Sequence, residues 1–179
     1  MLAVTLVLLS SLVAAPSLAQ ASPSAAEYQI KAAYLVKFLG YIDWPSQAFG
    51  AGDAPLVIGV LGAGSLADEL AQVASGRQVG GRALAVRKLR PGDAATELQV
   101  LFIARPENAR LPTIAATARD RALLIVTESD EAMPQHSAIN FVVVDDKVRF
   151  DVATHAFDKA NLRVSARLLT VARKVMGTP

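Results

Sequence analysis

Cysteine is absent from the 179-residue chain, and its absence excludes several kinds of chemistry. The protein can form no disulfide bond, use no thiolate nucleophile and build no cysteine-based zinc or iron–sulfur site. Histidine is scarce, because only His136 and His155 are present and no metal-binding spacing links them. A G-x-S-x-G nucleophile elbow is missing as well. The sequence therefore predicts no catalytic residue, no metal and no cofactor, in a protein that is not an enzyme.

Charge is also scarce. Charged residues make up 19% of the chain, and the formal net charge is only +2. So small an excess of positive charge does not favour nucleic-acid binding. Hydrophobic residues make up 53%, which is enough for a sizeable core in one domain of this length. We therefore expect one folded domain that binds no nucleic acid.

The first segment, residues 1–21, lacks charged residues altogether. It is largely apolar from Leu2 to Val13, is broken by Pro16 and ends in small residues, as a secretory signal peptide does, although no Lys or Arg precedes the apolar run. The run is too short to span a bilayer of about 30 Å comfortably. We expect cleavage near residue 21, which leaves residues 22–179 as a single α/β domain in the periplasm without further membrane insertion.

In the remaining chain, short apolar strands alternate with helical patterns. Residues 56–61, 98–104 and 122–128 are apolar runs bounded by turn signals, which is typical of buried strands. Helical patterns occur at residues 24–42, 65–74, 107–119 and 154–160. The alternation predicts an α/β fold with a largely parallel central sheet and helices on both faces. A β-hairpin around Asp145-Asp146 and a last helix from Ser165 to about Met176 are expected to close the domain.

A glycine motif follows the first apolar strand. In LVIGVLGAGSLADEL, Gly62, Gly64 and Ala67 match G-x-G-x-x-[GA] between a strand and a helix, the context of a dinucleotide-binding turn. No acidic ribose partner follows at the expected distance, and no acid or base supplies a reaction. The simpler interpretation is a tight turn, and a nucleotide-binding enzyme that uses Gly62 and Gly64 is an alternative.

The aromatic residues are concentrated in YLVKFLGYIDWP, residues 34–45, which holds the only tryptophan and two of the three tyrosines. On a helix, apolar side chains cover two neighbouring arcs, formed by Ile30, Tyr34, Phe38 and Tyr41 and by Leu35, Leu39 and Ile42. Lys31 lies between these arcs, and its amino group is expected to extend to solvent. The side left for solvent consists of Ala32, Ala33, Val36, Lys37 and Gly40.

A helix that is apolar on so many sides needs more than one packing partner. Core packing accounts for one side, and a second protein chain is a candidate for the other, because tyrosine and tryptophan are enriched in interfaces. The candidate partner-binding residues of this helix are Tyr34, Val36, Lys37, Phe38, Tyr41 and Trp44.

The expected last helix offers a second candidate surface. One arc is apolar and contains Leu168, Leu169, Ala172, Val175 and Met176. Arg167 and Lys174 are expected on the opposite arc. This basic face is either an ordinary solvated surface or a contact for an acidic partner.

Several stretches resemble the YfiR/HmsC-like family. They are YQIKAAYLVKFLGYIDWP, LVIGVLG, INFVVVDDKVRFDV and LRVSARLLTVAR, in the family's order from Tyr28 to Arg173. The resemblance implies a periplasmic regulatory protein that binds the periplasmic domain of an inner-membrane diguanylate cyclase and represses cyclic di-GMP synthesis, and thereby biofilm formation. Some members carry disulfides, but a chain without cysteine cannot use a disulfide redox switch.

Three functions are thus under consideration. The first is a periplasmic regulator without catalysis, whose partner is a cyclase or a similar membrane sensor, with a homodimer also possible. The second is the nucleotide-binding enzyme described above. The third is a small-ligand carrier with an aromatic pocket around Tyr34, Phe38 and Trp44. The missing acid, base and metal constellations favour the first and third.

Overall fold

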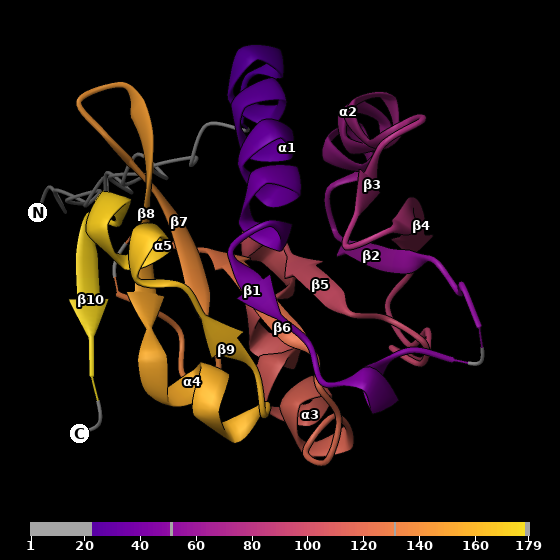
Figure 1. Ribbon diagram of the computed structural model, residues 1–179. Coiled ribbons are helices and arrows are strands. Elements are labelled where there is room, and N and C mark those ends of the chain that lie inside the picture. Colours follow the sequence, from indigo (N-terminus) through magenta and orange to yellow (C-terminus); the bar gives the residue numbers. More distant parts are fainter. Residues whose placement is uncertain (1–22, 51, 131, 178–179) are drawn as a thin grey trace, which may run out of the picture.

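The computed structural model describes residues 23–50, 52–130 and 132–177 (Figure 1). The expected signal peptide, residues 1–21, lies outside the described residues and stays a prediction. The helices are α1 (Ala25–Leu39), η1 (Ser46–Ala48), α2 (Gly64–Ala74), η2 (Arg105–Arg110), α3 (Leu111–Thr117), α4 (Thr154–Lys159) and α5 (Ala166–Val171). Among the described residues, no helix has the length and apolar character needed to cross a membrane.

An eight-stranded sheet forms the centre of the domain, in the order β10-β8-β7-β6-β5-β2-β4-β3. Its strands are β2 (Leu56–Leu61), β3 (Gln78–Val79), β4 (Arg82–Leu89), β5 (Val100–Ile103), β6 (Leu124–Glu128), β7 (Ile139–Val144), β8 (Lys147–Ala153) and β10 (Lys174–Met176). All neighbouring pairs are parallel except β3–β4 and the β7–β8 hairpin. A separate antiparallel ladder joins β1 (Ile42–Asp43) to β9 (Arg163–Val164). The largely parallel sheet that the sequence predicts is confirmed.

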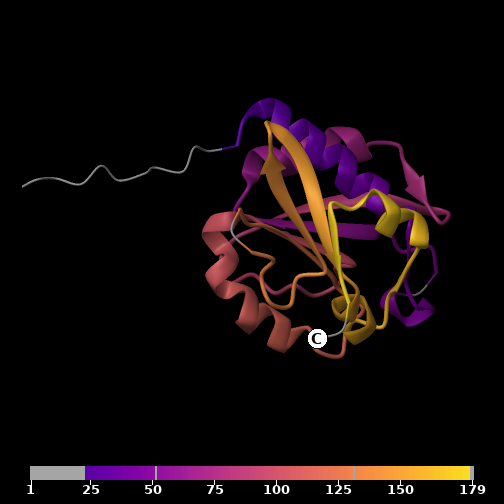
Figure 2. The same cartoon turned by 90° about the vertical axis from the view of Figure 1, so that its left-hand side faces the viewer.

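Helices cover both faces of the sheet, as expected. Helices α1 and α2 lie side by side over one face, and α3 covers the other (Figures 1 and 2). The side chains of β5 alternate between two cores: Val100 and Phe102 pack below α1, whereas Leu101 and Ile103 pack against α3. A strand buried on both faces is apolar throughout, and this explains the continuous apolar runs in the sequence.

Local sequence signals account for several boundaries. The Ser24 hydroxyl accepts a hydrogen bond from the Glu27 backbone N–H (3.1 Å), so Ser24 caps α1. The β7–β8 hairpin turns at Asp145 and Asp146, which have positive φ angles of 49° and 56°. Two such residues fit a type I′ turn, whose twist matches that of a hairpin.

The C-terminal segment corrects the prediction of one long helix. α5 ends at Val171, and the chain then adds β10 parallel to the open edge of β8. The Arg173 guanidinium binds the buried Asp151 carboxylate (Nε–Oδ1, 2.8 Å), and its backbone N–H donates to the Phe150 carbonyl (2.8 Å). The helix prediction was wrong because the free edge of β8 and the Asp151 carboxylate offer bonds that a longer helix could not make.

A buried ion pair fixes α1 to the sheet. The Lys31 side chain is 1% exposed, and its Nζ donates to Glu128 Oε2 (2.5 Å) and to Glu27 Oε1 (2.5 Å). Glu128, at the end of β6, also accepts the Arg105 backbone N–H through Oε1 (3.2 Å). The expectation that Lys31 extends its charge to solvent was therefore wrong, because a carboxylate from a distant strand lies beneath the helix.

We predict that Lys31→Met lowers the free energy of unfolding by about 3 kcal/mol, because it leaves Glu128 buried without its cation. Lys37→Met, which removes an exposed lysine from the same helix, should change it by no more than about 0.5 kcal/mol. In the double variant Lys31→Met/Glu128→Gln the loss should be smaller than the sum of the single losses. Urea denaturation measures the free energy of unfolding of the unaltered protein, of Lys31→Met, Glu128→Gln and Lys37→Met, and of the double variant. Equal effects at Lys31 and Lys37 would contradict a stabilising role for the pair.

Candidate functional site

Most aromatic side chains of α1 belong to a cluster with the β7–β8 hairpin. Phe38 stacks on Phe141 (ring centroids 5.7 Å apart) and meets Phe150 edge-on (4.8 Å). Tyr34 stacks on Phe38 (5.7 Å) and meets Phe150 edge-on (5.6 Å). Phe38 is fully buried, whereas Tyr34 is half-buried. The inner aromatics therefore serve the core, and the tyrosine edge remains at the surface.

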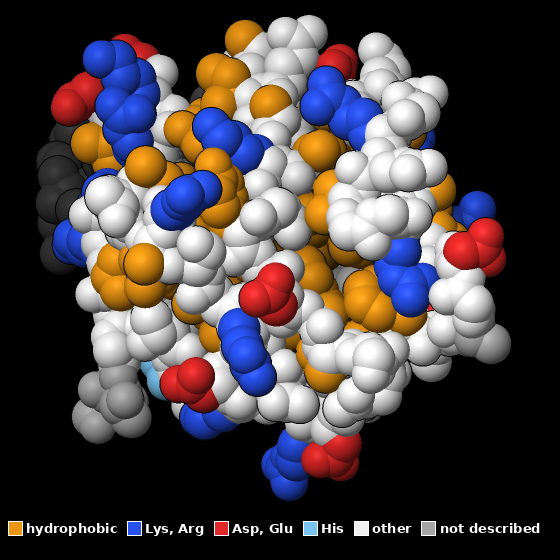
Figure 3. Space-filling model, viewed as in Figure 1, with side chains coloured by type: hydrophobic (Ala, Val, Ile, Leu, Met, Phe, Trp, Pro, Cys, Tyr) orange, Lys and Arg blue, Asp and Glu red, His pale blue; other side chains and the backbone are white. Residues whose placement is uncertain are grey.

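A groove of about 210 Å³ runs along this tyrosine edge, between α1 and α5. Its lining comes from α1, the turn that follows it, β8 and α5: Tyr34, Lys37, Phe38, Tyr41, Phe150, Arg167, Leu168 and Val171. Figure 3 shows apolar and basic side chains together over this part of the molecule. We call these eight residues the α1–α5 groove.

The second wall of the groove is positioned by the chain that follows β9. The Ser165 backbone N–H donates to the Tyr41 carbonyl (2.8 Å), which places the start of α5 beside the end of α1. The Ser165 hydroxyl caps α5 by accepting from the Arg167 N–H (3.3 Å), and Leu168 is buried below. Arg167 stays exposed, and the Val171 side chain is 66% exposed at the end of the helix.

The groove is positively charged. Of the described residues that line it, Lys37 and Arg167 are cationic and none is acidic. Neither cation takes part in an ion pair within the described part of the chain. Ile30, 45% exposed, lies one helical turn before Tyr34 and extends the apolar surface along α1. This arrangement suits a partner that presents apolar side chains flanked by carboxylates.

The structure brings together five of the eight candidate partner-binding residues. Tyr34, Lys37, Phe38, Tyr41 and Arg167 all line the groove, although α1 and α5 are far apart in the sequence. The other three, Val36, Trp44 and Lys174, lie outside it.

Val36 and Trp44 face other parts of the fold. Val36 is only 8% exposed, and it lines a hollow between α1 and α2 together with Val73. The prediction that Val36 is exposed to solvent was therefore wrong. Ala32, also expected at the surface, is fully buried. The Trp44 indole N–H donates to the Gln99 carbonyl before β5 (3.3 Å), so Trp44 does not complete an aromatic pocket with Tyr34 and Phe38.

Lys174 does not share a helical face with Arg167. It lies on β10, opposite Asp151 of β8, whereas Arg167 lies on α5. Both side chains are exposed, but the continuous basic helix face predicted from the sequence is absent from the described C-terminal segment. Val171 and Phe150, by contrast, were not selected from the sequence. Val171 is the last residue of α5, which is shorter than the helix predicted from the sequence. Phe150 reaches the groove only through tertiary packing.

The glycine motif forms a tight turn in which only one glycine is constrained. Gly62 has φ +80°, and a Cβ at this position would lie 2.6 Å from Glu107 Cγ. Gly64 begins α2, and a Cβ there would meet nothing within 4 Å. The Glu107 side chain thus lies against the turn on which the pyrophosphate of a dinucleotide would rest, and it occupies part of that space. This geometry favours the interpretation of the glycine motif as a tight turn over its interpretation as a nucleotide-binding site.

Titratable groups also gather around the first two turns of α1, where Glu27, Tyr28 and Lys31 lie near Glu128. Burial raises the pKa of Tyr28 above its ordinary value, and the negative charge of Glu128 raises it further, against the opposing effect of Lys31. Within the described residues, no three His, Asp or Glu side chains come close enough together to hold a metal ion. The charged groups around Tyr28 are therefore explained by the buried ion pair of Lys31 with Glu128, which fixes α1 to the sheet.

A family model described as YfiR/HmsC-like matches residues 28–173. The match covers most of the chain, so the protein belongs to the YfiR/HmsC-like family, whose members are periplasmic regulatory proteins. No curated protein matches the chain. The matched range contains α1 from Tyr28 onward, the sheet strands from β2 to β8 and all eight residues of the groove.

We predict that the two glycines of the turn respond differently to alanine. Gly62→Ala should destabilise the protein by about 1–3 kcal/mol, because it combines a positive φ with a contact against Glu107. Gly64→Ala should be neutral or slightly stabilising, since it adds a better helix former in open space. Thermal unfolding of both variants tests this difference. An equal loss in both would mean that the turn is constrained in another way.

Proposed function

We propose that the protein is a non-catalytic periplasmic regulator that binds the periplasmic domain of an inner-membrane diguanylate cyclase and represses cyclic di-GMP synthesis. Membership of the YfiR/HmsC-like family supports a regulatory role. The single structural observation that carries the proposal is the α1–α5 groove, with exposed apolar side chains beside two unpaired cations within the described residues. An exposed apolar surface rimmed by polar groups is typical of a protein-binding site.

The groove has eight lining residues, whereas a stable interface involves about 20–30 residues on each partner. It would form the centre, and the neighbouring surface of α1, including Ile30, would extend it. Tyrosine and arginine are the residue types most often found at the energetic centre of interfaces. Tyr34, Tyr41 and Arg167 are accordingly the expected anchors.

A membrane sensor fits the groove better than a second copy of this chain. In a two-fold dimer through this surface, each groove would face an identical one. Lys37 and Arg167 of both copies would then come together without acidic partners in the groove, and like charges in an interface oppose association. The partner expected here carries acidic and apolar residues on its docking surface.

Repression would arise from differential affinity. A regulator that binds only the inactive state of a sensor shifts the equilibrium toward that state, without chemistry of its own. A shift from about 1:99 to 99:1 requires about a 10⁴-fold preference for the inactive state. A signal that weakens binding at the groove would release the cyclase.

We predict that Lys37→Glu/Arg167→Glu weakens binding to the periplasmic domain of an inner-membrane diguanylate cyclase from the same organism by at least about tenfold, because it reverses both charges of the groove. Cellular cyclic di-GMP should rise in a strain that carries this variant. Calorimetric titration measures the first effect, and nucleotide extraction measures the second.

The control is Arg119→Glu, a charge reversal at an exposed position beyond α3, on the other side of the sheet. It should bind and repress like the unaltered protein, and the thermal midpoints of all variants should agree within a few degrees. Unchanged binding and unchanged cyclic di-GMP in the groove variant would overturn the proposed docking surface. Failure of the unaltered protein to bind this cyclase domain would overturn the proposed partner.

A further inference from the structure

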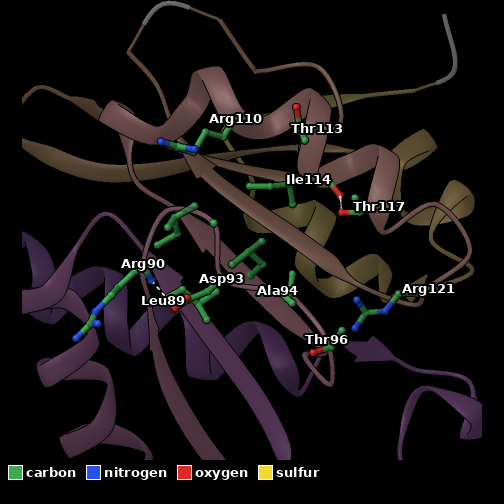
Figure 4. A pocket seen from close by; sticks show the side chains of 14 residues that line it. Leu89, Arg90, Asp93, Ala94, Thr96, Arg110, Thr113, Ile114, Thr117 and Arg121 are labelled. Atoms are coloured by element: carbon green, nitrogen blue, oxygen red, sulfur yellow. Dashed lines mark hydrogen bonds between the residues drawn. The ribbon is translucent and has the colours of Figure 1, made fainter.

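A second cavity lies on the opposite face of the sheet from the α1–α5 groove. It measures about 350 Å³ and lies between α3 and the connection from β4 to β5 (Figure 4). This connection crosses β2, and residues 90–99 contain no helix. A parallel crossover is usually helical. With a loop in place of a helix, part of this face of the sheet is left uncovered, and the cavity occupies that gap.

The floor of the cavity is apolar. It is formed by Leu61, Leu89 and Leu101 of three adjacent strands and by Ile114 of α3. These side chains belong to the smaller of the two cores or pack against it. The volume lies at the lower end of the range for small-molecule sites, about 300–1,000 Å³. A compact organic molecule would therefore fit, whereas a long lipid chain would not.

The rim carries more positive than negative charge. Arg90, Arg110 and Arg121 line it together with one acid, Asp93. Arg110 is held by Glu107 (2.6 Å), and Figure 4 shows the Arg90 side chain leading away from the cavity. Arg121 is half-buried and reaches toward the loop that carries Thr96, and it makes no ion pair within the described residues. Arg121 is thus the cation available to a ligand.

The loop wall is held in place by the protein itself. Arg87 Nη2 donates to the carbonyl oxygens of Ala94 (2.9 Å) and Thr96 (3.1 Å). The Asp93 carboxylate accepts the Arg90 backbone N–H (2.8 Å). A site whose walls are fixed before binding loses less conformational entropy when a ligand enters.

We propose that this cavity binds a small monocarboxylate with an apolar body. The apolar part would rest on the leucine floor, and the carboxylate would pair with the Arg121 guanidinium, whose planar shape matches a carboxylate. An inorganic anion would leave the floor unfilled, and a neutral apolar molecule would leave Arg121 unused. This inference does not depend on the proposed regulatory function, because it concerns different residues on the other side of the sheet.

Octanoate is a suitable probe, and amide chemical shifts of the purified protein report where it binds. Octanoate should shift the amides of residues 92–96 and 113–117 in a saturable way, and 1-octanol should bind about tenfold more weakly because it lacks the charge. Arg121→Gln should weaken octanoate binding by about the same factor. Thr96→Trp, a bulky change at an exposed position of the mouth, should weaken it further.

Arg119→Gln is the matched control, because it removes an exposed arginine two positions away and outside this cavity. It should leave octanoate binding unchanged. The proposal is overturned if octanoate at millimolar concentration shifts none of these amides, if 1-octanol binds equally well, or if Arg119→Gln and Arg121→Gln weaken binding to the same extent. Arg119 is exposed and Arg121 is only half-buried, so neither substitution is expected to unfold the protein.

Discussion

The buried contact between Lys31 and Glu128 sets the orientation of α1, and the surface of the molecule follows from that orientation. A charged pair this deeply buried is stable only while both partners stay together. With Lys31 directed at the sheet, Phe38 lies on nearly the same side of the helix, whereas Lys37 lies about 120° around it. Rotation of α1 would separate the ion pair and the aromatic cluster together. The fold therefore holds one face of α1 inside and presents another beside α5.

The aromatic residues in and just after α1 serve two purposes. Some of their atoms fill the core, and others form part of the surface. Phe38 and the inner edge of Tyr34 fill the core against Phe141 and Phe150. The outer edges of Tyr34 and Tyr41 remain at the surface with Lys37 and Arg167. Core packing thus supplies a rigid support for a recognition surface, since a side chain fixed by its neighbours has little entropy to lose on binding.

Patterns within short segments of the sequence predicted much of the fold. The apolar runs of β2, β5 and β6, the helix starts at Ser24 and Ser165 and the Asp145-Asp146 hairpin were all predicted correctly, because each depends on nearby residues. The errors concern partners far away in the chain. Lys31 is buried because of Glu128, Val36 because of α2, and β10 forms because β8 has a free edge. The groove itself could not be predicted, since Ser165 must first bind the Tyr41 carbonyl.

Hydrogen exchange in the complex tests the central claim, that the α1–α5 groove is the docking surface, most directly. The amides of residues 34–41 and 166–171 should exchange more slowly when the periplasmic domain of the cyclase is bound than in the free protein. Amides of α3, on the opposite face, should be unaffected. Protection confined to α3 or to the tip of the β7–β8 hairpin, with α1 and α5 unchanged, would contradict the account.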